Sequence, residues 1–138
     1  MGETARPLEV ELSWEGEQRF HGRAGSAEIV LDGNALAGPS PVQALALALA
    51  SCMAIDVVHI LTKGRHEPRA LRAHLEADRA DTEPKRIRGV RLRFTVTGDV
   101  PADKVERAIA LSREKYCSVW HSLRQDIAFE TGFTVTPA

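Results

Sequence analysis

The feature that most constrains the fold is a long apolar stretch at residues 40–64, SPVQALALALASCMAIDVVHILTKG. Its ends have the signals of a helix. Ser40 is a good N-cap, Pro41 suits the first helical position, and Gly64 suits the position just past the end. Apolar residues occupy nearly every face, so this helix must be covered nearly all round. A chain of 138 residues has difficulty doing that alone, which predicts a partner subunit.

Composition and charge exclude several classes of protein. The stretch approaches membrane-spanning length, but Asp56, His59 and Lys63 carry polar groups that are costly in lipid, so we expect a buried helix and no membrane association. The net charge is −1, and no basic surplus favours nucleic acid. The first residues lack the pattern of a secretory signal, and two distant cysteines give no disulfide framework. These features predict a reducing, cytoplasmic location.

The remaining chain is divided into short periodic segments. Six of them have the apolar pattern of strands: residues 8–14, 19–23, 27–31, 71–78, 87–97 and 127–135. A helical pattern runs from Pro101 to about residue 115, and a short one begins at Cys117. No internal repeat or linker appears. We therefore predict a single α+β domain over residues 1–138, with a mostly antiparallel sheet around a long central helix.

The two cysteines are the main candidates for chemistry. Within an apolar helix, Cys52 is most simply a small buried hydrophobic side chain. Nothing near it in sequence lowers its pKa, and Asp56 one turn later disfavours a thiolate, so a reactive Cys52 requires a cation from elsewhere in the fold, such as an arginine. Cys117 begins a short helix, whose N–H groups favour a thiolate. If the two cysteines meet in space, they have the properties of a peroxidatic and a resolving cysteine.

Other site patterns are weaker. The two cysteines with His59 and His121 offer four zinc ligands, but their spacing resembles no compact structural zinc site, and we expect no metal. The sequence contains no glycine-rich phosphate loop, Ser-His-Asp pattern or HExxH motif. We expect Trp120 to be a packing residue, although it lies close to Cys117 in sequence and is a candidate for the substrate pocket.

Two segments resemble the OsmC-like family, which includes the osmotically inducible OsmC proteins and the organic hydroperoxide resistance proteins. GPSPVQALALALASCMAIDVV is similar to the central helix of the family, with a proline near the start and a cysteine after an apolar run. EKYCSVWHSL is similar to the second cysteine motif. The resemblance covers essentially the whole chain. It implies an OsmC-like fold and an intertwined homodimer, with the long helices packed centrally and the sites at the subunit interface.

The resemblance also implies an enzyme that reduces organic hydroperoxides with thiols, in defence against oxidative stress. Cys52 would attack the peroxide and become a sulfenic acid, and Cys117 would condense with it to a disulfide. A small dithiol or a lipoyl group would then reduce the disulfide, with no bound cofactor. In some members an arginine from the N-terminal strands stabilises the thiolate. Arg19 is the first candidate for that role in this chain, and Arg23 is the second.

One position departs from the pattern of the peroxidase members. They usually carry a glutamate just after the proline at the helix start, ten residues before the cysteine, and this chain has Val42 there, followed by Gln43. We assign both residues to the substrate pocket, where Gln43 can orient an arginine but supplies no charge. The segment SCMAIDVVHILTKGR is most similar to a less characterised branch of the family. A second function therefore stays open: a protein with little peroxidase activity that senses redox state or binds a small apolar or electrophilic ligand.

Overall fold

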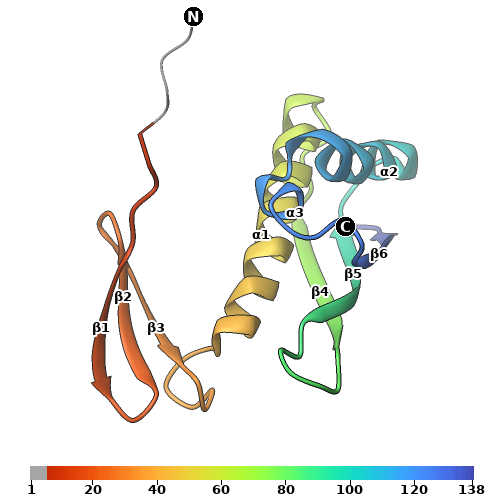
Figure 1. The fold of residues 1–138 in the computed structure, drawn as a ribbon. Coiled ribbons are helices and arrows are strands. Elements are labelled where there is room, and N and C mark those ends of the chain that lie inside the picture. Colours follow the sequence, from red (N-terminus) through yellow and green to blue (C-terminus); the bar gives the residue numbers. More distant parts are fainter. Residues whose placement is uncertain (1–5) are drawn as a thin grey trace, which may run out of the picture. The chain divides into compact units, whose positions relative to one another are not determined.

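A computed structural model describes residues 6–138; the first five residues, which belong to the predicted domain, lie outside the described part. The elements follow one another along the chain as shown in Figure 1: β1 (Glu11–Gly16), β2 (Arg19–Ala24), β3 (Ala27–Asp32), α1 (Pro41–Lys63), β4 (Ala70–Arg79), β5 (Ile87–Thr97), α2 (Ala102–Leu111), a π-helical turn η1 (Ser112–Tyr116), α3 (Ser118–His121) and β6 (Ala128–Thr136). They form two compact units, Met1–Leu45 and Ala46–Ala138, which are described in turn.

The first unit is an antiparallel meander in the order β1-β2-β3, as the sequence predicts. The predicted first strand begins at residue 8, whereas β1 begins at Glu11, opposite Arg23 of β2. β2 ends at Ala24, just before the turn at Gly25, where φ is +62° and the chain reverses toward β3, so residues 8 and 9 lie beyond the end of the neighbouring strand. One face of this sheet is apolar and largely exposed, and it carries Leu12, Trp14, Phe20, Ile29 and Leu31.

The loop after β3 is held by hydrogen bonds that prepare the start of α1. The buried Asp32 carboxylate accepts hydrogen bonds from the N–H groups of Ala37, at 3.0 Å, and Asn34, at 2.9 Å, and these bonds lower its pKa. At the helix start, Ser40 N–H donates to Gln43 Oε1 over 2.9 Å and Gln43 N–H donates to Ser40 Oγ over 3.2 Å. This reciprocal pair is a capping box, and it confirms Ser40 as the N-cap.

The second unit contains a mixed sheet in the order β4-β5-β6. β4 and β5 are antiparallel, while β6 runs parallel to β5 because the chain crosses over through α2, η1 and α3 before it returns. The fold is thus α+β with both antiparallel and mixed sheets, and three of its four strand pairings are antiparallel. Inward side chains of β5, α1 and α2 form one hydrophobic core, which includes Leu92, Phe94, Met53, Val57, Val105 and Ile109.

Only one face of α1 is buried in this core. It presents Leu49, Met53, Val57 and Leu61, which are four residues apart and therefore lie on one side of a helix. The opposite side is also apolar but open to solvent, with Leu47 60% and Ile55 68% exposed. In the described residues α1 is the one helix long and apolar enough to cross a membrane, a property that core helices of soluble proteins share.

The helical segment after Pro101 differs from a uniform α-helix. α2 ends at Leu111, and the next five residues widen into the π-helical turn η1. This turn is closed by a 2.7 Å hydrogen bond from Cys117 N–H to Ser112 O, which spans five residues instead of four. π-turns inside helices often occur at functional sites, and this one ends at Cys117.

Candidate functional site

The two cysteines meet within the second unit. Cys52 lies half-buried in the middle of α1, and Cys117 lies fully buried between η1 and α3. Both are free thiols, and the Cys52 side chain is within hydrogen-bonding reach of Cys117. A reactive thiol pair requires that the two cysteines lie close together, and the spacing of the residues in sequence does not determine whether they do.

The surroundings of Cys117 keep its thiol protonated. Burial raises the pKa of Cys117 to about 11, the N–H of Trp120 acts in the opposite direction, and the neighbouring Cys52 adds to the increase. The Trp120 N–H donates to Cys117 Sγ over 3.4 Å, as expected for a residue at a helix start. However, α3 has only four residues, and burial outweighs its effect. The helix-start N–H groups do favour a thiolate at Cys117, as expected, but burial has the larger effect and the net result is a raised pKa.

A second polar contact joins the elements that carry the two cysteines. Ser112 Oγ donates a 2.7 Å hydrogen bond to Asp56 Oδ2. Asp56 follows Cys52 by one turn of α1, and Ser112 is the residue whose carbonyl accepts the Cys117 N–H. Ser112 is completely buried. This serine is not among the site residues predicted from the sequence.

The sequence does contain a signal for Ser112. It continues the apolar face of α2, since Val105, Ala108, Ile109 and Ser112 follow the three- and four-residue spacing of one helix side. A serine at such a position is either exposed by a change in the helix or buried with a hydrogen-bond partner. In this structure the second outcome holds, because Asp56 provides the acceptor.

Trp120 belongs to the core beneath Cys117. Its side chain is 5% exposed, and the centroid of its ring lies 4.5 Å from that of Phe129. The guanidinium of Arg113 lies over both rings, 4.8 Å from the Phe129 centroid and 5.9 Å from that of Trp120. The expected packing role of Trp120 agrees with this position, and its contribution to a substrate pocket stays a prediction.

Two hollows flank α1 in the second unit. One has a volume of about 510 Å³ and is lined by Asp56, His59 and Lys63 of α1 together with Leu111 and Tyr116. It therefore extends from Asp56 of α1 to Tyr116, the residue just before Cys117, and neither cysteine lines it.

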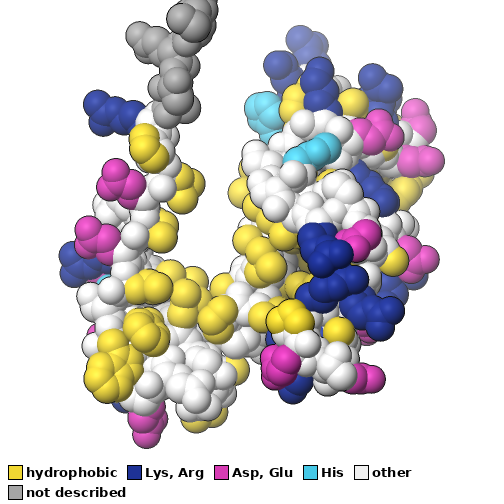
Figure 2. All heavy atoms as spheres, viewed as in Figure 1, with side chains coloured by type: hydrophobic (Ala, Val, Ile, Leu, Met, Phe, Trp, Pro, Cys, Tyr) yellow, Lys and Arg dark blue, Asp and Glu magenta, His cyan; other side chains and the backbone are white. Residues whose placement is uncertain are grey.

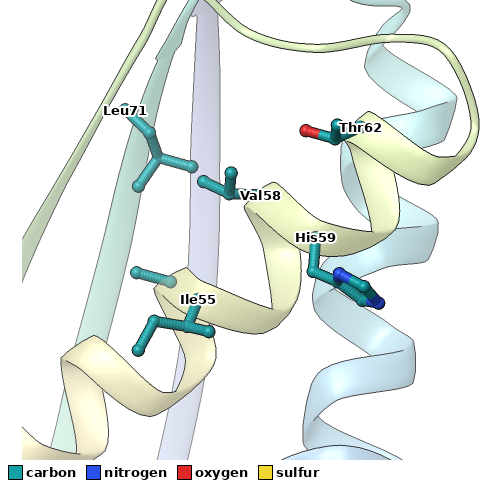
Figure 3. Close-up of a pocket in the computed structure, with 6 residues that line it drawn as sticks. Ile55, Val58, His59, Thr62 and Leu71 are labelled. Carbon is teal, nitrogen blue, oxygen red and sulfur yellow. The ribbon is translucent and has the colours of Figure 1, made fainter.

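The other hollow is apolar and has a volume of about 650 Å³. Figure 3 shows Ile55, Val58, His59 and Thr62 of α1 at this hollow, together with Leu71 of β4. Ile55 and Val58 belong to the exposed side of the helix. This surface is suited to an apolar partner more than to a charged ligand.

Four other predicted site residues belong to the first unit. Arg19 Nη1 is 3.5 Å from Glu17 Oε2 at a half-buried position of the sheet, and Arg23 Nε is 3.6 Å from Glu28 Oε1 at an exposed one. Val42 is half-buried in the first turn of α1, and Gln43 is exposed and takes part in the capping box. The roles of Arg19, Arg23, Val42 and Gln43 at a thiol site stay predictions.

Among residues 6–138 there is no group of three or more His, Cys, Asp or Glu side chains that would hold a metal ion. The zinc ligands considered from the sequence are therefore not assembled in the described part of this single chain. The expectation of an external reductant in place of a bound cofactor stays a prediction.

Comparison with known proteins places this fold and its cysteines in a family. The family described as OsmC-like protein matches residues 32–132, which include both cysteines. The chain belongs to the OsmC-like protein family. Protein YhfA of Escherichia coli K12 is 34% identical over 134 residues, which cover 95% of this chain and all of YhfA. The resemblance seen in the two cysteine segments is confirmed.

Solved structures of other proteins have the same fold. A hypothetical protein from Aquifex aeolicus VF5 is 28% identical and superposes with a TM-score of 0.90, over 97% of this chain and 99% of that one. An organic hydroperoxide resistance protein OsmC from Legionella pneumophila is 16% identical, with a TM-score of 0.70 over 96% of this chain and 99% of its own. At that identity the second likeness concerns the fold alone.

Proposed function

We propose that this protein is a cytoplasmic, two-cysteine peroxidase that reduces organic hydroperoxides in defence against oxidative stress. The observation that carries the proposal is the contact between Cys52 and Cys117, which are 65 positions apart in sequence and both free. The OsmC-like family includes a protein described as an organic hydroperoxide resistance protein, and membership is consistent with a peroxidase or redox role.

The proposed reaction has three balanced steps. The Cys52 thiolate attacks the outer oxygen of the hydroperoxide, the O–O bond breaks, and the alkoxide takes a proton to leave as an alcohol. The Cys117 thiol then attacks the sulfur of the Cys52 sulfenic acid, and the departing hydroxide takes the thiol proton to form water. A dithiol or a dihydrolipoyl group supplies two electrons and two protons that restore both thiols, becoming a disulfide itself.

The different surroundings of the cysteines support this division of roles. Cys52 is half-buried, so a hydroperoxide can reach it more easily than it can reach the fully buried Cys117. A thiol with a pKa of about 11 reacts slowly with peroxide in solution, because the thiolate is the nucleophile. Cys117 is therefore suited to wait as a thiol until a sulfenic acid forms beside it.

A homodimer is part of the proposal. The exposed side of α1, including Leu47, Ile55 and Val58, is a large apolar surface for a protein of this size. The sheet of the first unit also exposes an apolar face, and Figure 2 shows hydrophobic side chains gathered on its surface. Association of two chains would bury these apolar surfaces, and each chain would then fold cooperatively as a single domain.

The dimer would also complete the thiol site. We propose that Arg19, or else Arg23, provides the cation that Cys52 needs, with Val42 and Gln43 beside it at the start of α1. The alkyl group of the hydroperoxide would lie against apolar side chains of α1, and Trp120 would support the pocket from the core. This arrangement accounts for a cysteine within an apolar helix.

A second candidate function rests on the start of α1. Its first turn contains no acidic residue, and the Gln43 side-chain oxygen accepts a hydrogen bond from Ser40 N–H. Without a carboxylate to hold an arginine, the Cys52 thiolate would form less readily. The protein would then act as a redox sensor, or bind a small apolar or electrophilic ligand, with little peroxidase turnover.

The deciding experiment is hydroperoxide consumption by the reduced protein. Cumene hydroperoxide or tert-butyl hydroperoxide is supplied with dihydrolipoamide, and the rate is compared with those of Cys52→Ser and Cys117→Ser. We expect Cys52→Ser to abolish turnover and Cys117→Ser to consume about one equivalent and stop. Equal rates for the wild type and Cys52→Ser would refute the peroxidase. A single slow turnover in the wild type would favour the sensor.

A further inference from the structure

Packing of the hydrophobic core does not require the hydrogen bond between Ser112 and Asp56. Ser112 is fully buried, and within residues 6–138 the only other buried polar side chain is Asp32, which holds the loop before α1. A buried hydroxyl without a partner costs free energy, whereas an alanine at this site would cost none. Packing alone therefore does not explain the Ser112–Asp56 pair. Its position beside the two thiols suggests a role in their chemistry.

The geometry connects this hydrogen bond to the thiol pair. On α1, Asp56 follows Cys52 by four residues, which is about 6 Å along the helix. On the facing segment, Ser112 and Cys117 are joined by the bond that closes the π-turn. Asp56 accepts a hydrogen bond from Ser112, and Cys52 is near enough to Cys117 to affect its pKa, so the two segments approach each other at two points. A contact at one point fixes the register at the other.

We propose that Asp56 and Ser112 are positioning residues that hold Cys117 in register with Cys52 for disulfide formation. This inference rests on the proposed function, because it concerns the step in which the Cys117 thiol attacks the Cys52 sulfenic acid and water leaves. The neutral Cys117 thiol is a weak nucleophile, so the rate of this step depends mainly on how closely and how constantly the two sulfurs are held together.

The first test measures proximity without any peroxide. The wild type and variants are equilibrated in buffers of reduced and oxidised glutathione, and the Cys52–Cys117 disulfide is quantified by mass spectrometry. We expect Ser112→Ala and Asp56→Ala to lower the effective concentration of the thiol pair about ten- to hundredfold, the range for loss of a hydrogen bond to a charged group. Asp56→Asn keeps an acceptor oxygen for Ser112, so its effective concentration of the thiol pair should be within about threefold of the wild-type value.

A matched control removes a different hydroxyl from the same region. Ser122 is exposed, lies just past the end of α3 and donates a hydrogen bond to Ser118 O, away from the Asp56 contact. Ser122→Ala should leave the effective concentration of the thiol pair unchanged. Circular dichroism and thermal unfolding identify any variant that does not fold. If Ser112→Ala fails to fold, Asp56→Ala carries the test, because Asp56 is only half-buried.

The second test separates the two chemical steps in a single turnover with cumene hydroperoxide. Trapping with dimedone reports sulfenic acid at Cys52, and free-thiol loss reports the disulfide. We expect Ser112→Ala, which changes no charge near Cys52, to form sulfenic acid at the wild-type rate. Both Ser112→Ala and Asp56→Ala should form the disulfide about tenfold or more slowly, with sulfinic acid accumulating at Cys52. Equal slowing of both steps, with no rescue by Asp56→Asn, would mean a general structural role and overturn the inference.

The two tests also separate this inference from the proposed function. If the wild type forms the disulfide in glutathione buffer but consumes no hydroperoxide, the peroxidase proposal fails and the positioning role is still judged by the variants. If folded Ser112→Ala and Asp56→Ala form the disulfide as readily as the wild type, the positioning role is wrong, whatever the peroxidase activity. A wild type that forms no disulfide in the buffer overturns it as well.

Discussion

The backbone N–H of Trp120 donates a hydrogen bond to Cys117 Sγ over 3.4 Å, at a position where the sulfur is completely buried. The bond favours the thiolate, and burial favours the thiol; burial prevails and raises the pKa of Cys117 to about 11. Cys52, on the facing helix, is only half-buried. The two cysteines are therefore neighbours in surroundings that differ, and most of the expected behaviour of the pair follows from that difference.

Cys117 should be slow to alkylate. A rise in the pKa from 9.0 to about 11 lowers the thiolate fraction about a hundredfold at a pH near 8, and burial blocks the reagent further. We expect iodoacetamide to modify Cys52 first, with Cys117 labelled only after unfolding. Peptide mass spectrometry of timed samples measures both rates. Equal labelling of the two cysteines in the folded protein would contradict the buried position of Cys117.

The raised pKa of Cys117 predicts a loss of stability at alkaline pH. Below pH 9.0 the thiol is protonated in both the folded and unfolded states, so its contribution is fully present. As the pH rises toward about 11, the unfolded state loses the proton while the folded state still holds it, and the free energy of unfolding falls. Urea unfolding between these values, compared with Cys117→Ala, isolates the effect. The variant should show a shallower decline, and parallel curves would refute the prediction.

An acid at the start of α1 should raise activity if the peroxidase proposal is correct. Val42→Glu supplies the missing carboxylate, which can hold a nearby arginine and so favour the Cys52 thiolate. We expect kcat/KM for cumene hydroperoxide to rise about tenfold. Val42→Gln is the matched control, because it has nearly the same size without the charge. If Val42→Glu and Val42→Gln have the same kcat/KM, the missing carboxylate does not limit the activity.

The exposed side of α1 should control association. Ile55 is 68% exposed in the single chain, and a charge there would be buried without a partner in the proposed dimer. Ile55→Glu should weaken dimerisation at least about tenfold, as measured by sedimentation equilibrium. Ala102→Glu, at the exposed first residue of α2, adds the same charge elsewhere and should leave association intact. A wild-type protein that sediments as a monomer would remove the dimer from the proposal.

Much of the secondary structure could be predicted because its signals are local. The alternation in β1, β2 and β3, and the Ser40 and Pro41 signals at the start of α1, depend on neighbours within a few residues. The errors lie where a distant segment decides the outcome. The alternating pattern begins at residue 8, but β1 begins only at Glu11, near the point where its partner β2 ends at a turn. β6 pairs in parallel with β5 because the chain crosses over through α2 and α3 before β6 begins.

For the candidate site, the sequence by itself determined which residue types were present and on which elements: a cysteine in the middle of an apolar helix, another at a helix start, and a helix start without an acid. The tertiary structure decided that Cys52 and Cys117 are neighbours, that Ser112 donates a hydrogen bond to Asp56, and that burial raises the pKa of Cys117 to about 11. The physical reason is that contacts and burial arise from packing between segments far apart in the chain, which no local pattern encodes.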